Sequence, residues 1–146
     1  MEMCSHETFM DCPYYEQLMY VGDTRLEVLV SYAWERDERL PRKAVRIYDE
    51  SRKSPGLTQS RYPSRIQQTI PGFSLWWIGM VYDYALWRDD APFVKDRLPG
   101  VRAILDTFCK YRTADGVYAS PPGWNFMDWC VKWLSLIHIS EPTRPY

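Results

Sequence analysis

The 146-residue sequence predicts an all-α fold built from two successive helical hairpins. Each hairpin pairs a helix expected to be buried with a helix whose outer surface is charged, and stretches rich in Pro and Gly separate them. Hairpins of one inner and one outer helix are typical of an α/α barrel. Two hairpins cannot close such a ring, so the sequence predicts only part of a barrel.

The first hairpin is expected over residues 24–36 and 37 to about 53. Thr24 and Glu27 have the spacing of a capping box, and Gly22 before them allows a sharp turn. The apolar stripe of the first helix comprises Leu26, Leu29, Val30, Ala33 and Trp34. The second helix has Pro41 in its first turn, where the missing N–H costs least. Its stripe comprises Leu40, Ala44, Ile47 and Tyr48, and charged residues cover the rest.

The second hairpin follows a long irregular loop, residues 51–71. Residues 73–89 are apolar almost all round, so this helix is expected to be surrounded by protein. A further helix runs from residues 89–92 to about residue 112, with a kink predicted at Pro99. Its stripe comprises Val101, Ile104, Leu105 and Phe108. The tryptophans assigned to the core are Trp34, Trp77 and Trp87.

The remaining residues are predicted to be loops and the start of another helix. Residues 114–120 form a turn with a short extended piece, residues 121–128 a rigid loop, and residues 129–133 begin a helix. An irregular loop thus precedes each expected inner helix. We therefore expect the three loops to gather on one rim of the partial barrel, and we place a functional site there.

Composition narrows the classes of function. Hydrophobic residues make up 46% and aromatic residues 16% of the chain, which is globular composition, and a net charge of −1 offers no electrostatic basis for binding nucleic acid or anionic membranes. The longest apolar stretch, residues 73–87, contains Asp83 and is too short for a membrane span.

The four cysteines lack a Cys-x-x-Cys spacing and are interpreted as thiols. Cys4, His6 and Cys12 are too loosely spaced to predict a metal site.

The stretch from residue 11 to residue 23 carries three carboxylates, Asp11, Glu16 and Asp23, on a loop stiffened by Pro13. Such a loop can hold carboxylates in place for chemistry. The alternative is that these acids only cap the following helix and interact with solvent.

The run CSHETFMDCPYYEQLMYVGDTR, residues 4–25, resembles the signature of the catalytic domain of bacterial α-L-rhamnosidases, an inverting glycoside hydrolase family. GLTQSRYPS, residues 56–64, and IPGFSLWW, residues 70–77, resemble the same family. The resemblance covers nearly all of residues 1–133. It implies an (α/α)6 barrel of six hairpins, about a third of it present here.

By this resemblance Glu16 is the general acid, and Tyr14, Tyr15, Met19 and Tyr20 are expected to shield its carboxyl from water. Asp11 and Asp23 match family carboxylates that bind rhamnose hydroxyls. Arg61, together with Tyr62, is expected to donate hydrogen bonds to the sugar. The tryptophans near loop edges, where a ring can pack on the sugar, are Trp76, Trp124 and Trp129.

Tyr20 and Asp128 complete the predicted substrate-binding set. The expected substrate is a rhamnose-containing glycoside, cleaved by acid and base catalysis without a metal or cofactor. Nothing in residues 1–133 matches the family's general base. His6 is expected to order its loop by hydrogen bonding.

The chain is expected to be an internal fragment. In the resembled family the CSHE run lies deep inside a longer protein, and residues 134–146 resemble read-through of a transposase-type sequencing adapter, so they are excluded from the fold prediction. The fragment would lack the remainder of its own barrel. We therefore expect it to be inactive and to aggregate through exposed inner-helix surface.

Two other functions are compatible with the sequence. The chain could come from another six-hairpin glycosidase with a different sugar preference, which the identity of the released sugar would reveal. It could also come from a non-catalytic sugar-binding barrel, which would bind rhamnose and leave aryl rhamnosides intact.

Overall fold

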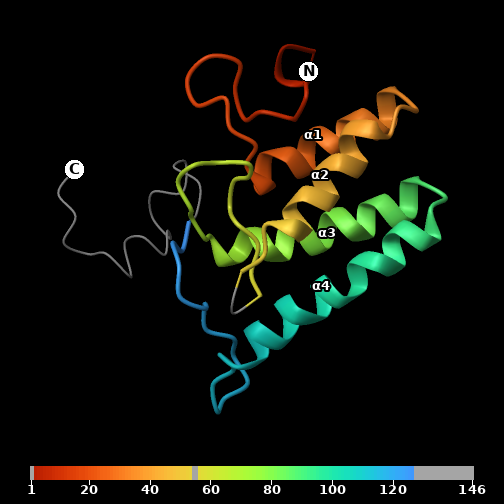
Figure 1. The fold of residues 1–146 in the computed structure, drawn as a ribbon. Coiled ribbons are helices and arrows are strands. Elements are labelled where there is room, and N and C mark those ends of the chain that lie inside the picture. Colours follow the sequence, from red (N-terminus) through yellow and green to blue (C-terminus); the bar gives the residue numbers. More distant parts are fainter. Residues whose placement is uncertain (1, 54–55, 127–146) are drawn as a thin grey trace.

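The computed structural model describes residues 2–53 and 56–126 (Figure 1). After a short 3-10 helix, η1 (Glu2–Cys4), the chain forms α1 (Val21–Trp34), α2 (Arg39–Glu50), α3 (Pro71–Trp87) and α4 (Ala91–Cys109). Helices α1 and α2 make the first hairpin, and α3 and α4 make the second. Within these described residues the β-type pairing is limited to isolated bridges. The prediction of an all-α fold with two hairpins is confirmed.

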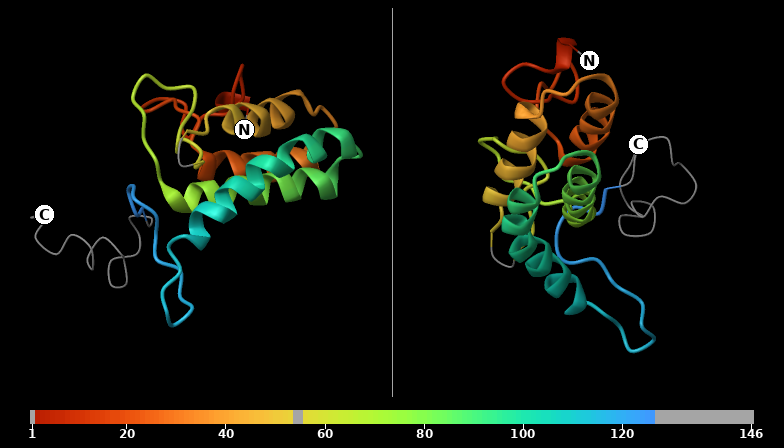
Figure 2. Two further views of the ribbon diagram at one scale, coloured as in Figure 1. Left: turned by 60° about the horizontal axis from the view of Figure 1, so that its bottom comes forward. Right: turned by 90° about the vertical axis from the view of Figure 1, so that its right-hand side faces the viewer.

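The four helices lie in two layers. Viewed from the side, α1 and α3 are neighbours in one layer and α2 and α4 in the other (Figure 2, right). The most extensive packing between helices joins α1 to α3. This is the predicted arrangement of two inner and two outer helices. None of these helices has both the length and the apolar character that crossing a bilayer requires.

The start of α1 differs from the prediction. The helix begins at Val21, so Thr24 lies inside it and the expected capping box with Glu27 is wrong. Thr24 is fully buried, and its hydroxyl lies 3.1 Å from the Tyr48 hydroxyl on α2. Gly22 belongs to the first helical turn and makes no sharp turn before it. A Cβ there would lie 2.9 Å from Cζ of Phe73, so this glycine lets α3 approach closely.

The buried face of α1 also differs from the predicted stripe. Leu26, Val30 and Trp34 are 55%, 53% and 87% exposed. The residues of α1 that are buried instead are Val21, Thr24, Val28, Ser31 and Tyr32. Both sides of this helix carry apolar residues, and only one of them is covered by the second hairpin. Periodicity alone could not show which side that is.

Helix α3 is buried on one side only. Trp77 is fully buried as predicted, whereas Trp87 is 50% exposed and stacks on Tyr32 with ring centroids 6.0 Å apart. The assignments of Trp34 and Trp87 to the core are therefore wrong. The expectation that protein surrounds α3 on all sides does not hold for these two hairpins, because its other side, including Leu86, faces solvent.

The core lies between the layers and is joined by hydrogen bonds from large aromatic side chains. The Trp77 indole N–H on α3 donates to the carbonyl of Val45 on α2 at 2.9 Å. The Tyr48 hydroxyl donates to the carbonyl of Met19 at 2.8 Å. Because these polar atoms are satisfied, both large rings can be fully buried at little electrostatic cost.

The outer helices agree better with their predicted stripes. In α2, Ala44, Ile47 and Tyr48 are buried, and Pro41 is in the first turn. Asp90 is the N-cap of α4, and its carboxylate accepts from the Phe93 N–H at 3.1 Å.

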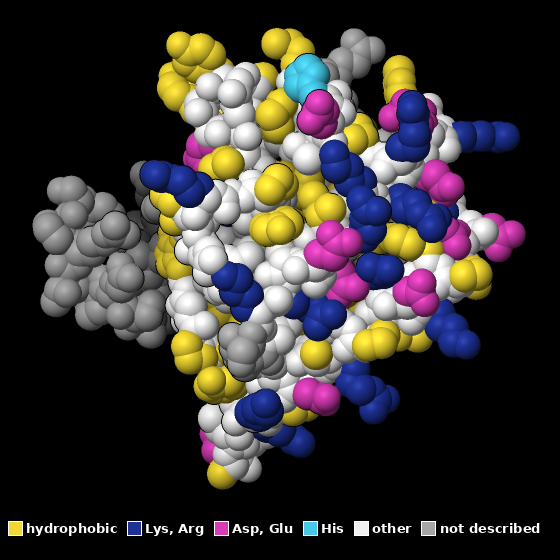
Figure 3. Space-filling model, viewed as in Figure 1, with side chains coloured by type: hydrophobic (Ala, Val, Ile, Leu, Met, Phe, Trp, Pro, Cys, Tyr) yellow, Lys and Arg dark blue, Asp and Glu magenta, His cyan; other side chains and the backbone are white. Residues whose placement is uncertain are grey.

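Helix α4 continues through Pro99 to Cys109. In its predicted stripe Ile104 is buried, whereas Leu105 is 47% exposed. Charges of both signs are interspersed over the face formed by these outer helices (Figure 3).

The loops preceding the inner helices meet at one end of the hairpins, as predicted. The Val21 N–H donates to the carbonyl of Ser60 at 2.9 Å, and the Tyr62 N–H donates to the carbonyl of Met19 at 3.1 Å. The third loop joins them where the Trp124 N–H donates to the carbonyl of Thr69 at 2.9 Å. These backbone pairs form a rim, and the loops that make it carry Asp11, Glu16, Tyr20 and Arg61 of the predicted site.

Candidate functional site at the loop rim

The loop that carries Glu16 is closed at its neck by Asp11 and Leu18. The Asp11 N–H donates to the Leu18 carbonyl at 2.9 Å, and the Leu18 N–H donates to Oδ1 of Asp11 at 2.8 Å. One oxygen of the Asp11 carboxylate is therefore occupied by the loop itself. Asp11 acts as a loop-closing residue, and it does not cap the helix.

Two further contacts hold the inside of this loop. Nε2 of Gln17 donates to the carbonyl of Pro13 at 2.8 Å, and the backbone N–H of Glu16 donates to Sγ of Cys12 at 3.2 Å. Gln17 adopts φ = 52°, a left-handed conformation that is uncommon for a residue other than glycine. No sequence pattern indicates these roles of Cys12 and Gln17, because each depends on the path of the folded loop.

Glu16 is exposed, and the aromatic residues before it do not enclose its carboxyl. Tyr14 and Tyr15 are 79% and 88% exposed and pack edge-to-face on each other at 5.1 Å. Met19 is buried beneath the loop. The expected shielding of Glu16 by Tyr14 and Tyr15 is therefore wrong, since nothing in the described part of the chain presses these rings against the carboxyl.

Tyr20 and Arg61 join the Glu16 loop to the loop before α3. They form an antiparallel bridge, and Nη1 of Arg61 donates to the Tyr20 hydroxyl oxygen at 2.9 Å. Burial and a hydrogen bond to the Glu16 side chain raise the pKa of Tyr20, and the charge of Arg61 opposes this rise. The three side chains therefore form a row in which the guanidinium holds the phenol and the phenol contacts the Glu16 carboxylate.

A second pair of acidic residues lies in the first two turns of α1. Asp23 lies in the first turn, and Glu27 follows it one turn later on the same helix. Burial, together with the charges of Asp23 and Asp11, raises the pKa of Glu27 to about 7. One carboxylate oxygen of Glu27 is buried without a hydrogen-bond partner. The sequence contained one signal for this role of Glu27, which is its position four residues after Asp23. This signal was missed because Glu27 was interpreted as part of a capping box.

The predicted tryptophan Trp76 lies on α3 and is 39% exposed. The guanidinium of Arg25 lies over its ring, 5.2 Å from the centroid. Trp124 is half-buried and packs against Phe126, which in turn packs against Phe73 at the start of α3. Both tryptophans are thus held on elements that reach the rim.

The structure brings together Glu16, Tyr20 and Arg61 by direct contact. It places Asp11 and Asp23 within electrostatic range of the same half-buried carboxyl, Glu27. Asp128 and Trp129, also predicted to bind substrate, lie outside the described residues. Among the residues described, no three His, Cys, Asp or Glu side chains lie close enough to hold a metal ion.

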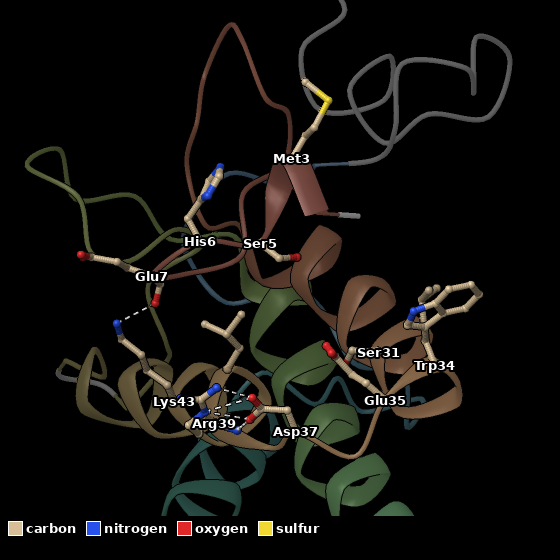
Figure 4. Close-up of a pocket in the computed structure, with 12 residues that line it drawn as sticks. Met3, Ser5, His6, Glu7, Ser31, Trp34, Glu35, Asp37, Arg39 and Lys43 are labelled. Atoms are coloured by element: carbon tan, nitrogen blue, oxygen red, sulfur yellow. Dashed lines mark hydrogen bonds and ion pairs between the residues drawn. The ribbon is translucent and has the colours of Figure 1, made fainter.

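A separate groove of about 980 Å³ lies between the N-terminal segment and the first hairpin (Figure 4). His6 and Glu7 line one side, and Trp34, Arg39 and Lys43 line the other. Nζ of Lys43 donates across it to the Glu7 carbonyl at 2.7 Å. None of the predicted site residues lines this groove, so it is not part of that site. His6 is exposed, and its backbone N–H donates to the Thr8 carbonyl at 3.2 Å.

Comparisons with known proteins agree with this architecture. The model of the family described as bacterial alpha-L-rhamnosidase 6 hairpin glycosidase domain matches residues 1–143. A crystal structure of the GH78 family rhamnosidase of Bacillus sp. GL1 is similar with a TM-score of 0.80 and 29% identity, over 87% of this chain and 13% of that chain.

A rhamnosidase from Klebsiella oxytoca with rhamnose bound has the same fold, with a TM-score of 0.77 and 23% identity, over 86% of this chain and 26% of that chain. This chain thus spans 13% and 26% of the two solved proteins. A comparison with curated proteins found no match.

Proposed function

Because this chain belongs to the bacterial α-L-rhamnosidase six-hairpin glycosidase family and its hairpins form part of that helical barrel, we propose that it contributes the acid-bearing rim of an inverting α-L-rhamnosidase. The reaction is the hydrolysis of terminal α-L-rhamnosyl residues from glycosides or polysaccharides. The observation that carries the proposal is the contact of Glu16 with the Tyr20–Arg61 pair on a loop closed by Asp11.

Glu16 is the catalytic residue in this proposal. Inverting hydrolysis requires one carboxylic acid to protonate the leaving oxygen and a second carboxylate, roughly 6.5 to 9.5 Å away, to activate water on the opposite face of the sugar. The exposure of Glu16 suits a donor that must reach a substrate from the rim. Arg61 and Tyr20 orient its carboxyl, because the guanidinium fixes the phenol that contacts it.

The remaining residues bind the sugar. Asp23 and the free oxygen of Asp11 accept hydrogen bonds from rhamnose hydroxyls, and Arg61 donates one. Trp76 offers a ring face to the apolar side of the sugar. Asp128 and Trp129 complete the set in this proposal.

The second carboxylate comes from elsewhere in the barrel, since nothing in residues 1–133 matches the family's general base. We therefore expect the 146-residue chain alone to be inactive. The inner helices also expose Leu26, Val30 and Leu86, which the other hairpins would cover, and this surface favours aggregation of the isolated chain.

The test is the Glu16→Gln variant of a complete enzyme that carries this sequence. General acid catalysis is worth about 10² to 10⁴ in rate, so hydrolysis of a rhamnoside with a poor leaving group should fall at least about a hundredfold. An activated aryl rhamnoside, whose leaving group needs little protonation, should be affected much less. Glu7→Gln is the control, because Glu7 is exposed on the separate groove and should retain full activity.

Near-normal turnover of the poor substrate by Glu16→Gln would remove Glu16 from the role of acid. Release of glucose or a uronate in place of rhamnose would identify another six-hairpin glycosidase. Binding of rhamnose without cleavage of any aryl rhamnoside by the complete protein would identify a sugar-binding barrel.

A further inference from the structure

Arg25 of α1 reaches across to α3 and touches it at two places. Its Nε donates to Oδ2 of Asp83 at 2.8 Å, and its guanidinium carbon lies 5.2 Å from the centroid of the Trp76 ring. The side chains of Arg25 and Asp83 are 28% and 10% exposed. An ion pair that is partly removed from water is stronger and better ordered than one on the open surface.

The three residues of α3 under this guanidinium share one helix face. Trp76, Gly79 and Asp83 follow each other at spacings of three and four residues, which places them in a row along α3. Gly79 provides the space between them. A Cβ at this position would lie 2.5 Å from Cζ and 2.6 Å from Nη1 of Arg25, closer than atoms can approach. The guanidinium therefore lies against bare backbone at Gly79.

We propose that Arg25, supported by Asp83 and Gly79, is a positioning residue that fixes the Trp76 ring at the rim and thereby sets the affinity of the site for a rhamnosyl group. The inference rests on the proposed function and adds residues to which that function assigns no role. Arg25 covers one face of the Trp76 ring, so a sugar packs against the opposite face. Asp83 keeps the guanidinium from rotating away.

Arg25 does not touch the reacting atoms in this scheme. Its loss should weaken substrate binding in the ground state and the transition state alike, which raises KM and leaves kcat little changed. A general loss of stability would not produce this split.

The structure offers a matched control in Arg97 of α4. Arg97 also pairs with a carboxylate on another helix, Asp49 at 3.1 Å, and also lies over an aromatic ring, Phe93 at 4.9 Å. Its side chain is 15% exposed, so its burial is comparable. It joins α2 to α4 in the outer part of the fold. Arg97→Met therefore removes the same kinds of interaction as Arg25→Met without touching Trp76.

The first measurement needs no activity and uses the 146-residue chain, kept monomeric by a mild detergent that covers its exposed apolar surface. The ¹⁵N–¹H heteronuclear NOE of the Trp76 indole N–H, identified by its absence in Trp76→Phe, reports how well the ring is ordered. It should fall in Arg25→Met and in Asp83→Asn and stay unchanged in Arg97→Met. An equally ordered indole in Arg25→Met and Arg97→Met would overturn the proposal.

Gly79→Ala is a second variant that disturbs the same contact and should still fold. Alanine favours a helix more than glycine does, so this variant should fold, yet its methyl group displaces the guanidinium. The Trp76 indole should again lose order. If it stays ordered in a folded Gly79→Ala chain, Gly79 and Arg25 do not hold the ring.

The second measurement uses a complete enzyme that carries this sequence. Arg25→Met should raise KM for aryl α-L-rhamnosides about tenfold with kcat within about threefold, as expected for a lost contact of 1 to 2 kcal/mol. Arg25→Lys, which keeps the charge, should recover part of the affinity, and Arg97→Met should leave KM unchanged. Loss of indole order without any change in KM would overturn the assigned effect on affinity. Absence of rhamnosidase activity in the unmodified complete enzyme, with the indole result intact, would instead overturn the proposed function.

Discussion

Nη1 of Arg61 lies 2.9 Å from the hydroxyl oxygen of Tyr20, and the same hydroxyl is hydrogen-bonded to the Glu16 side chain. Arg61 and Tyr20 come from two loops that are far apart in the sequence, and they are joined by an antiparallel bridge at the rim. Tyr20 therefore couples the position of the Glu16 carboxyl to the loop that carries Arg61. Nε of Arg61 is buried without a partner, so the contact with Tyr20 is important for satisfying this guanidinium.

Tyr20→Phe should loosen the Glu16 loop and weaken the fold. Hydrogen bonds to charged groups contribute about 1.5 to 3 kcal/mol, and the change would also leave Arg61 less well satisfied. We expect a loss of about 2 kcal/mol in the free energy of unfolding of the chain, measured by urea denaturation. In a complete enzyme kcat/KM should fall about tenfold or more.

The control for this variant is Tyr118→Phe. Tyr118 also forms an antiparallel bridge with an arginine, Arg112, whose guanidinium lies over its ring at 5.8 Å. Tyr118 is 53% exposed, so removal of its hydroxyl should change the free energy of unfolding by less than about 0.5 kcal/mol. Equal effects of the two substitutions would mean that the Tyr20 hydroxyl has no special role.

Glu27 should make the stability of the chain depend on pH. Its pKa is about 7 in the folded protein against an ordinary value of 4.5, so the folded state holds this proton more tightly than the unfolded state does. Stability is therefore unaffected below about pH 4.5 and decreases as the pH rises from 4.5 to 7.

Glu27→Gln should remove this decrease, because glutamine stays neutral. With allowance for partial exposure of Glu27, the variant should gain on the order of 1 kcal/mol over the wild type at pH 8 relative to pH 4.5. Urea denaturation across this pH range measures it. Glu50→Gln is the control, since Glu50 is exposed on α2 and pairs only loosely with Arg46 at 3.6 Å. A wild-type profile identical to that of Glu27→Gln would contradict the prediction.

Trp77→Ala should come close to unfolding the chain. Trp77 is fully buried between the layers and its N–H donates to the Val45 carbonyl, so truncation removes packing and a hydrogen bond between α3 and α2. Such substitutions cost about 3 to 5 kcal/mol, a large part of the stability of a small domain. Thermal unfolding followed by circular dichroism measures the loss.

Trp34→Ala provides the comparison with the same chemical change. Trp34 is 87% exposed, so its truncation should alter stability by less than about 0.5 kcal/mol. It should also reduce aggregation, because a large apolar surface is removed. A destabilisation similar to that of Trp77→Ala would show that Trp34 is buried in solution.

The sequence alone determined the helical hairpins, the buried stripe of α2, and the convergence of three loops at one rim. These features depend on local patterns: the spacing of apolar residues, the position of Pro and Gly, and the order of elements along the chain. The resemblance at residues 4–25 singled out Glu16 and Tyr20, and the resemblance at residues 56–64 includes Arg61. The structure brings these three residues together.

Only the tertiary structure decided which side of α1 is buried and which tryptophans belong to the core. A helix in a ring has apolar residues toward both neighbours, and periodicity does not say which neighbour is present. The same holds for the pair Arg25 and Asp83, which are 58 residues apart. It also holds for Glu27, whose raised pKa arises mainly from its burial in the folded chain, with smaller contributions from Asp23 and from Asp11 on the folded loop. Contacts between distant parts of the chain set these properties, and no local pattern encodes them.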